Sequence, residues 1–483
     1  MIRSRVRSGI VVAVSVAVAP GGYRAEGGEH GRRGPVPPNA VQPPGASFEG
    51  YPAVGRSQKV EIAREAVGAT VAGLAQNPVQ GTGRLLGRTA ERLGTRGQEV
   101  VRAFAFDGPL PPGDCPLAPR FPGRDLGDAG GPPTPATLTL IPDSDAAVQA
   151  LLGIIATARS RVDLVLWGWE DDPTGREVAA ALAERARAGV AVRLLVDRTG
   201  FLVHNAAAAR GEPTFLDRLA CVPNVRLIEE PGTDCRFDHR KVAVVDDRVA
   251  WSGSMILTEV ARRRWHNFAF LAEGPIVAQY ARLFADRWAE LGGPPAPRPC
   301  PPATSPAPNA VVRMVRTDVN ERSLRDAVYN AVDHAQRRIV LENPYFSDRI
   351  LAEKLVDARR RGVAVVAILT LRGNIRAENQ FEALMANRLL RAGAEVYLYP
   401  AMTHVKAMSV DGAWAYFGTG NFDELSLRNN REVSLTTTTP SLVAELDRVL
   451  FAADAAASER LTAPLPPPPI GARVKLALLA LWY

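Results

Sequence analysis

A short polar motif that occurs twice constrains the fold of this 483-residue chain more than any other feature. The first copy, residues 239–246, reads His-Arg-Lys-Val-Ala-Val-Val-Asp, and the second, residues 404–411, reads His-Val-Lys-Ala-Met-Ser-Val-Asp. A Gly-Ser pair follows the first copy at the same distance as a Gly-Thr pair follows the second. Because the chain holds only six histidines, two of them in one frame indicate an internal duplication.

Strand and helix patterns recur in the same order in front of both motifs. The first set predicts strands at 138–141, 161–167 and 190–196 and helices at 144–159 and 175–189. The second set predicts strands at 311–315, 339–346 and 363–369 and helices at 324–336 and 354–362. Alternating strands and helices favour an α/β sheet. We therefore expect two duplicated α/β halves that pack about a pseudo-twofold axis, with the active site between them.

Changes in composition along the chain mark the expected boundaries of its segments. A basic start followed by the short apolar run Gly9–Ala19 is typical of a secretory signal and too short to span a bilayer. A Gly- and Pro-rich arm follows, with a helical pattern from Val60 to Arg102. The predicted divisions are a candidate signal peptide at 1–25, a disordered and helical arm at 26–135, the first half at 136–291, a Pro-rich linker at 292–309, the second half at 310–460 and a Pro-rich tail at 461–483.

Charge and cysteine content narrow the function only slightly. The formal net charge of +7 suits an anionic partner such as lipid headgroups or nucleic acid, although a solvated basic surface accounts for it equally well. Cys115, Cys221, Cys235 and Cys300 have neither Cys-x-x-Cys nor zinc-ligand spacing, so we expect small buried residues, with disulfides an alternative if the chain is exported.

The motif residues favour phosphoryl chemistry. Alternate residues of a strand share a face, so each histidine is expected to point the same way as the lysine two positions later. A pseudo-twofold arrangement would then bring two imidazoles and two ammonium groups together. One imidazole can attack phosphorus and the other can protonate the leaving alkoxide, while the lysines hold the non-bridging oxygens. This chemistry needs no metal and no cofactor, and the sequence shows no carboxylate cluster suited to Mg²⁺.

These residues resemble those of the phospholipase D superfamily, and within it the chain is most similar to bacterial cardiolipin synthases. The resemblance rests on the two His-x-Lys-x4-Asp motifs, on Arg240, on Glu273-Gly274-Pro275, on Pro344-Tyr345-Phe346 and on the run 418–426, which matches Gly-Ser-x-Asn-x-Asp-x-x-Ser. It covers roughly residues 137–450 and implies a covalent phosphatidyl-histidine intermediate.

The resemblance also implies roles for individual residues. His239 would be the nucleophile and His404 the general acid, although the near-symmetry permits the reverse. Glu432 would orient a catalytic imidazole and support its charged form. The phosphate-binding candidates are Lys241, Lys406, Asn421, Ser254 and Thr419, although a role as turn residues accounts for Ser254 and Thr419 equally well. The supporting candidates are Asp246 and Asp411, which are expected to hold local backbone, and Asn267.

Two positions in the first half depart from the family pattern. Ile256 stands where the family has Asn, and Asn267 stands where it has an acid, 28 residues after His239. Glu432 lies 28 residues after His404, so only the second half keeps its acid. The loss of one phosphate donor and one charge is expected to slow the reaction by about 10²-fold or more.

The leading hypothesis is phosphatidyl transfer from phosphatidylglycerol to a second lipid alcohol. Attack by water instead would make the chain a phospholipase D. The alternatives are a superfamily nuclease, which the positive charge favours but the lack of an interleaved basic and aromatic strip disfavours, and a degenerate member that binds anionic lipid without turnover. The expected partners are anionic phospholipids and a membrane surface rather than nucleic acid. A monomer is expected because one chain carries both motifs, and the candidate signal predicts a membrane-associated protein on the periplasmic side.

Overall fold

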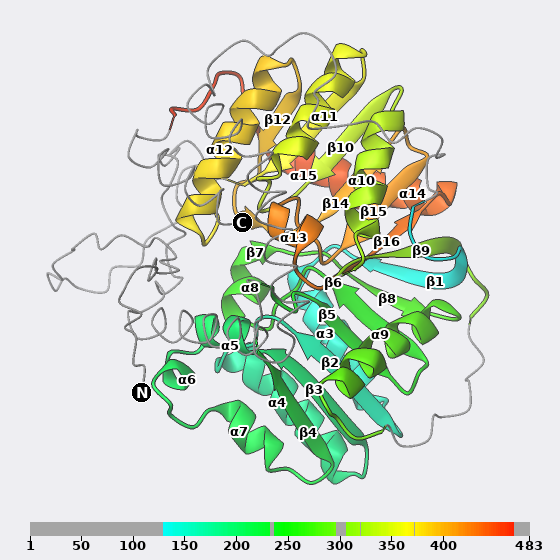
Figure 1. Cartoon of the computed structure of the whole chain (residues 1–483), viewed down its shortest axis with the longest axis vertical. Coiled ribbons are helices and arrows are strands. Elements are labelled where there is room, and N and C mark those ends of the chain that lie inside the picture. The colour runs from blue at the N-terminus through cyan, green and yellow to red at the C-terminus, as the bar shows by residue number, and fades with distance from the viewer. Residues whose placement is uncertain (1–128, 232–235, 296–305, 319, 371, 468–483) are drawn as a thin grey trace, which may run out of the picture.

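The computed structural model describes residues 129–231, 236–295, 306–318, 320–370 and 372–467 (Figure 1). The candidate signal peptide, nearly all of the N-terminal arm, most of the tail and the cysteines Cys115, Cys235 and Cys300 lie outside these residues. Cys221 is described and is exposed with a free thiol, so the expectation of a buried residue is wrong at that position.

The fold is mixed α/β, as predicted, with one large sheet built from both halves (Figure 1). Every helix and strand predicted within the two halves is present, whereas the helical pattern predicted from Val60 to Arg102 lies outside the described residues. The strands of the first half are β1 (Thr134–Ile141), β2 (Arg161–Leu166), β3 (Ala191–Asp197), β4 (Val225–Glu230), β5 (Lys241–Val245), β6 (Val249–Gly253), β7 (Trp265–His266) and β8 (Ala269–Glu273). Its helices are α3 (Ser144–Ala156), α4 (Pro173–Arg187), α5 (Arg198–His204), α6 (Ala206–Ala209), α7 (Phe215–Ala220), α8 (Glu259–Arg264) and α9 (Ile276–Glu290).

The second half repeats this order with small additions at its end. Its strands are β9 (Ala310–Thr317), β10 (Arg338–Glu342), β11 (Ala364–Leu369), β12 (Glu395–Leu398), β13 (Met402–Thr403), β14 (Ala407–Val410), β15 (Trp414–Gly418), β16 (Glu432–Thr437) and β17 (Glu459–Arg460). Its helices are α10 (Ser323–His334), α11 (Arg349–Arg360), α12 (Arg376–Arg391), α13 (Glu424–Arg428), α14 (Pro440–Leu446), the π-helix η1 (Asp447–Ala452) and α15 (Ala453–Ala457).

The strand order of the sheet displays the duplication. From its centre outward the first half reads β1-β8-β6-β5-β2-β3-β4, and the second half reads β9-β16-β15-β14-β10-β11-β12, followed by β17. The two halves meet where β1 and β9 run antiparallel, with Thr134 opposite Val312 and Ala136 opposite Ala310. This seam lies between the two lobes of the molecule (Figure 1). The halves are therefore related by a pseudo-twofold axis and share one continuous sheet.

Local sequence signals explain how the helices begin and end. Asp143 accepts a hydrogen bond from the backbone N–H of Ala146 at 2.7 Å and caps α3, and Asp348 caps α11 in the same way. Gly189 and Gly362 follow α4 and α11 with φ values of 94° and 91°, a region that glycine enters without a Cβ clash. The matched glycines thus end matched helices.

Apolar side chains form three clusters around the sheet. One lies between the first-half sheet and α3 and α4, and a second lies between the second-half sheet and α10, α11 and α12. The third contains residues of both halves and is covered by α9, α14 and η1. Within it the rings of Phe270 and Phe417 lie 5.2 Å apart, edge to face. This shared core fixes the two halves against each other. Within the described residues we find no helix that is both apolar enough and long enough to cross a bilayer.

Candidate active site

Both motif histidines lie in the short segments that lead into equivalent strands. His239 precedes β5 and His404 precedes β14, and the two strands occupy matching places in the sheet. His239, Lys241, His404 and Lys406 are all buried. The charges of both lysines act on both imidazoles, so the fold brings the four motif side chains into one site, as the duplication predicts.

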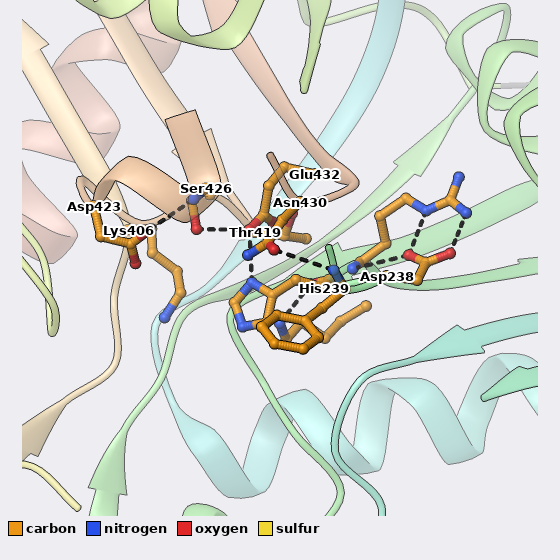
Figure 2. A network of polar contacts seen from close by, with 12 residues as sticks. Asp238, His239, Lys406, Thr419, Asp423, Ser426, Asn430 and Glu432 are labelled. Carbon is orange, nitrogen blue, oxygen red and sulfur yellow. Dashed lines mark hydrogen bonds and ion pairs between the residues drawn. The ribbon is translucent and has the colours of Figure 1, made fainter. Parts of the chain in front are cut away.

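Glu432 holds His239 from the other half of the chain (Figure 2). Nδ1 of His239 lies 2.7 Å from Oε1 of Glu432, which also accepts a hydrogen bond from Ser426 Oγ at 2.7 Å. The second carboxylate oxygen accepts from Thr419 Oγ1 at 2.5 Å. Both carboxylate oxygens already accept hydrogen bonds from hydroxyl groups. The carboxylate therefore has no proton to give, and toward the imidazole it can act only as an acceptor. Nδ1 therefore carries the proton, and Nε2 of His239 keeps its lone pair for another partner.

Asn267 holds His404 in the equivalent way but without a charge. Its Oδ1 atom lies 2.9 Å from Nδ1 of His404, while its Nδ2 atom donates to Ala261 O at 3.0 Å and to Ser144 Oγ at 3.1 Å. Because these two acceptors fix the amide orientation, the oxygen must face the imidazole. His404 thus also presents Nε2, yet the partner of its Nδ1 atom is an amide, which cannot offset an imidazolium charge.

Backbone hydrogen bonds also join each histidine to the other half of the chain. The N–H of His239 donates to the carbonyl of Arg431 at 3.0 Å, and the N–H of His404 donates to the carbonyl of His266 at 2.7 Å. The adjacent residues form matching parallel bridges, Asp238 with Arg431 and Thr403 with His266. Each histidine is consequently positioned, in both backbone and ring, by the half to which it does not belong.

The two lysines lie in the interior with reduced basicity. Nζ of Lys241 donates to the carbonyl of His239 at 2.5 Å, and Nζ of Lys406 donates to that of His404 at 2.7 Å. Burial lowers the pKa of Lys241 to about 7, against the opposing effect of nearby carboxylates. Burial, and then the charge of Lys241, hold the pKa of Lys406 well below its usual value. A bound anion would favour the charged form of both side chains.

The pKa values of the two imidazoles and of the Glu432 carboxyl group are also shifted in the directions that favour their neutral forms. Burial, followed by the charges of the lysines, holds the pKa values of His239 and His404 well below the usual value. Burial raises the pKa of Glu432 to about 8 in the substrate-free site, although Lys241 opposes the shift, so the carboxylate that accepts from Nδ1 of His239 predominates above that pH. Two neutral imidazoles, each with Nε2 unprotonated, provide a nucleophile and a base.

The predicted phosphate ligands are placed unequally. Asn421 is buried, and its Oδ1 atom has no hydrogen-bond partner within the described residues. The hydroxyls of Ser254 and Thr419 instead accept hydrogen bonds from the backbone N–H groups of Phe268 and Val433, at 2.9 and 3.0 Å. Both hydroxyls therefore brace the residues that orient the imidazoles, and their role toward phosphate stays a prediction.

Asp246 and Asp411 lie at the ends of β5 and β14 and bind backbone. Asp246 accepts from the N–H groups of residues 159–161, all at 2.8 Å. Asp411 accepts from those of residues 336–338, at 2.8 to 2.9 Å. Their φ values of 54° and 57° are left-handed, a conformation that Asp tolerates better than most residues. The last residue of each motif thus stabilises the backbone of a neighbouring loop, residues 159–161 in one half and 336–338 in the other.

Ile256 stands at the position that Asn421 occupies in the second half, and His204 lies close to it. Ile256 is buried in the first-half cluster. A Cβ atom added to Gly168 would lie 3.2 Å from Ile256 Cβ and 2.9 Å from Nε2 of His204, the last residue of α5. Burial and then the charge of Lys241 lower the pKa of His204 to about 4. The sequence contains no signal for this third imidazole near Lys241, because the loops after β3 have no counterpart motif.

Ser144 and Ser426 are functional neighbours that the sequence analysis did not select. Ser426 is the last residue of the Gly-Thr-Gly-Asn-Phe-Asp-Glu-Leu-Ser run, so its spacing could have identified it. Ser144 looks like an ordinary first residue of a helix, and only the fold brings it to Asn267.

Comparisons with known proteins agree with this geometry. The profile of a family described as "Cardiolipin synthase, PLD-like domain" matches residues 151–288 and 328–453. Cardiolipin synthase A of Citrobacter koseri is 26% identical over 317 residues, which are 62% of this chain and 65% of that protein, just under two thirds of its length. The protein of the same name from Salmonella paratyphi B is 26% identical over 339 residues, 66% of this chain and 68% of that protein. The crystal structure of phosphatidylserine synthase from Haemophilus influenzae covers 74% of this chain and 95% of its own, with a TM-score of 0.59 and 15% identity, a likeness of fold.

Proposed function

This chain belongs to the cardiolipin synthase, phospholipase D-like family, and on that premise we propose that it is a phosphatidyltransferase acting on phospholipids. The proposed donor is phosphatidylglycerol and the proposed acceptor is the hydroxyl of a second lipid. The observation that carries the mechanism is the contact between His239 Nδ1 and Glu432 Oε1 at 2.7 Å. This contact leaves Nε2 of His239 as a nucleophile and places a carboxylate where positive charge develops on the ring.

In the first step Nε2 of His239 attacks the phosphorus atom of the donor. The P–N bond forms as the bond between phosphorus and the glycerol oxygen breaks. His404, which must have bound a second proton at Nε2 before this step, gives that proton to the departing alkoxide. The lysines and Asn421 hold the non-bridging oxygens. The product is a phosphatidyl-histidine together with free glycerol.

In the second step the acceptor displaces His239. Nε2 of His404, now neutral, removes the proton of the acceptor hydroxyl as its oxygen attacks phosphorus and the P–N bond breaks. A second phosphatidylglycerol as acceptor gives cardiolipin, whereas water gives phosphatidic acid. The unequal partners of the two imidazoles favour His239 as the nucleophile, because its ring becomes cationic on attack and Glu432 can stabilise that charge, whereas Asn267 beside His404 cannot.

The test is to incubate the purified full chain with phosphatidylglycerol vesicles and follow the lipids by mass spectrometry. Cardiolipin with released glycerol is the expected result, and phosphatidic acid alone would identify a hydrolase. His239→Ala and His404→Ala should each abolish turnover. After an alkaline quench, a modified peptide should contain His239, and modification of His404 instead would reverse the assignment.

A superfamily nuclease is the competing proposal, supported by the net charge of +7. Cleavage of single-stranded DNA without any lipid turnover would replace the lipid proposal. Binding to anionic vesicles without conversion of either substrate would identify a degenerate member. We further propose that the chain acts at a membrane surface, with anionic phospholipids as its partners.

A further inference from the structure

Three side chains that could bind a metal ion lie together next to the segment that carries His404. They are His266 of β7, Glu342 at the end of β10 and Asp454 of α15, and one ligand atom from each lies within 4.8 Å of the others. Nε2 of His266 is 2.9 Å from Oδ2 of Asp454. The hydroxyl of Thr403 donates to Oε1 of Glu342. The sequence analysis predicted no such cluster, because its members are far apart along the chain.

Glu342 supplies a second and independent observation. Its side chain is fully buried, with an exposed fraction of 0%, and its Oε2 atom finds no N–H or O–H donor within the described part of the chain. The neighbouring side chain is a second carboxyl group, Asp454, and burial followed by the charge of Asp454 holds the pKa of Glu342 well above its usual value. A buried carboxylate oxygen without a partner costs free energy unless a proton or a cation satisfies it. Asp454 is also buried, so two carboxylates share a space that has little access to water.

In the duplicated half an arginine, Arg431, stands at the position of His266. The bridge between Thr403 and His266 corresponds to the bridge between Asp238 and Arg431. There the guanidinium of Arg431 pairs with Glu230 at 2.6 Å, and Asp238 pairs with Arg240. In the described residues, by contrast, Glu342 and Asp454 pair with no lysine or arginine, and His266 is the only basic group that meets them. A permanent cation in one half is replaced by a neutral metal ligand in the other.

We propose that His266, Glu342 and Asp454 bind one divalent transition-metal ion, Zn²⁺ or Mn²⁺. One imidazole nitrogen and two carboxylate oxygens form a donor set that suits these ions, whereas Mg²⁺ and Ca²⁺ favour oxygen ligands alone. Tyr399 stacks on the imidazole of His266 with ring centroids 5.0 Å apart and limits its rotation. The side chain of His266 is 15% exposed, which leaves an edge through which an ion can enter.

The proposed ion would position the catalytic site rather than react. It would join His266 of the first half to Glu342 and Asp454 of the second. The carbonyl of His266 accepts the hydrogen bond from the N–H of His404 at 2.7 Å, and Thr403, which binds Glu342, precedes His404. The ion would therefore hold the segment that carries His404. This inference does not depend on the proposed reaction, because binding of the ion is measured without turnover.

The test uses the full chain after treatment with a chelator. Zn²⁺ and Mn²⁺ are titrated by calorimetry, the bound metal is counted by mass spectrometry after desalting, and Tm is measured with and without the ion. The expected result is one equivalent of metal and a rise in Tm. His266→Arg installs the side chain found in the matching position, so it should fold, bind no ion and show no shift in Tm. Glu342→Gln should also lose binding.

A matched control is His334→Gln, which removes a histidine on α10 whose Nδ1 atom lies 2.9 Å from the carbonyl oxygen of Asn330 in its own helix. This variant should bind the ion like the unaltered chain. The proposal is overturned if the unaltered chain takes up no stoichiometric metal, or if His266→Arg binds as much as the unaltered chain does. Circular dichroism of His266→Arg separates loss of binding from loss of fold.

Discussion

Nδ1 of His239 lies 2.7 Å from Oε1 of Glu432, although 193 residues separate them and they belong to different halves of the chain. The equivalent contact, 2.9 Å between Nδ1 of His404 and Oδ1 of Asn267, joins the halves in the opposite sense. One imidazole thus has a carboxylate partner and the other has an amide. The first predictions follow from that difference.

Glu432→Gln should lower kcat by about 10²-fold or more, because the charge that stabilises the cationic ring of His239 is removed while the size of the side chain is kept. KM should change little, since the substrate phosphate does not contact this residue in the proposed mechanism. Steady-state kinetics with phosphatidylglycerol vesicles at pH 9, above the pKa of about 8 for Glu432 in the substrate-free site, measure both constants. An unchanged kcat would show that orientation alone, and not charge, is the contribution of Glu432.

Asn267→Asp should raise kcat and shift its pH dependence. Burial and then the lysines hold the pKa of His404 well below its usual value, so the protonated acid is scarce near neutral pH. A carboxylate 2.9 Å from Nδ1 would raise that pKa, and the limb of the profile that depends on protonated His404 would move to higher pH. The kcat profile from pH 5 to 9 checks this. A profile that does not move would contradict the role of His404 as the acid.

Ile256→Asn should lower KM for the phospholipid if the missing amide is a phosphate donor. The new side chain would lie near Gly168, at the position that corresponds in sequence to Asn421 of the second half. Ile256→Val, which keeps the site apolar, is the matched control. An equal change in both variants would assign the effect to packing rather than to a hydrogen bond.

Lys241→Met should abolish activity and stabilise the substrate-free protein. Burial lowers the pKa of Lys241 to about 7 from a usual value of 10.5, so the unfolded chain binds this proton more tightly than the folded one. Between pH 7 and pH 10.5 the unfolded state therefore carries more protons, and the stability of the unaltered chain rises with pH. The advantage of the variant is largest below pH 7 and shrinks as pH approaches 10.5. Each kcal/mol should appear as roughly 1–2 °C in Tm for a fold of this size. A difference in Tm that is independent of pH would contradict this account.

Asp246→Ala and Asp411→Ala should reduce stability with little effect on kcat per folded molecule. Each change leaves three backbone N–H groups without their acceptor, which should cost about 1–3 kcal/mol. Unfolding in urea, together with kinetics at low temperature, separates the two effects. A large loss of kcat in a stable variant would place these aspartates in the chemistry after all.

The sequence predicted the fold well, since apolar periodicity and matched glycines are local signals and the repeat doubles each of them. It also identified the histidines and lysines that meet in the site. It could not predict which half orients which imidazole, because the contact between His239 and Glu432 depends on how the halves pack. It missed Glu342 and Asp454 for the same reason, since a carboxylate at a strand end and another in a helix acquire meaning only when His266 lies between them.

Strand β1 has two partners, and this determines where the chain can be shortened. Residues 137–141 pair with β8 of the first half, whereas residues 134–136 pair with β9 of the second. A shortened chain that begins near residue 129 keeps the backbone hydrogen bonds between the halves. One that begins at residue 138 retains every motif residue but loses that ladder. Three residues without reactive side chains therefore add a backbone ladder to the shared core and to the two bridges that join the halves.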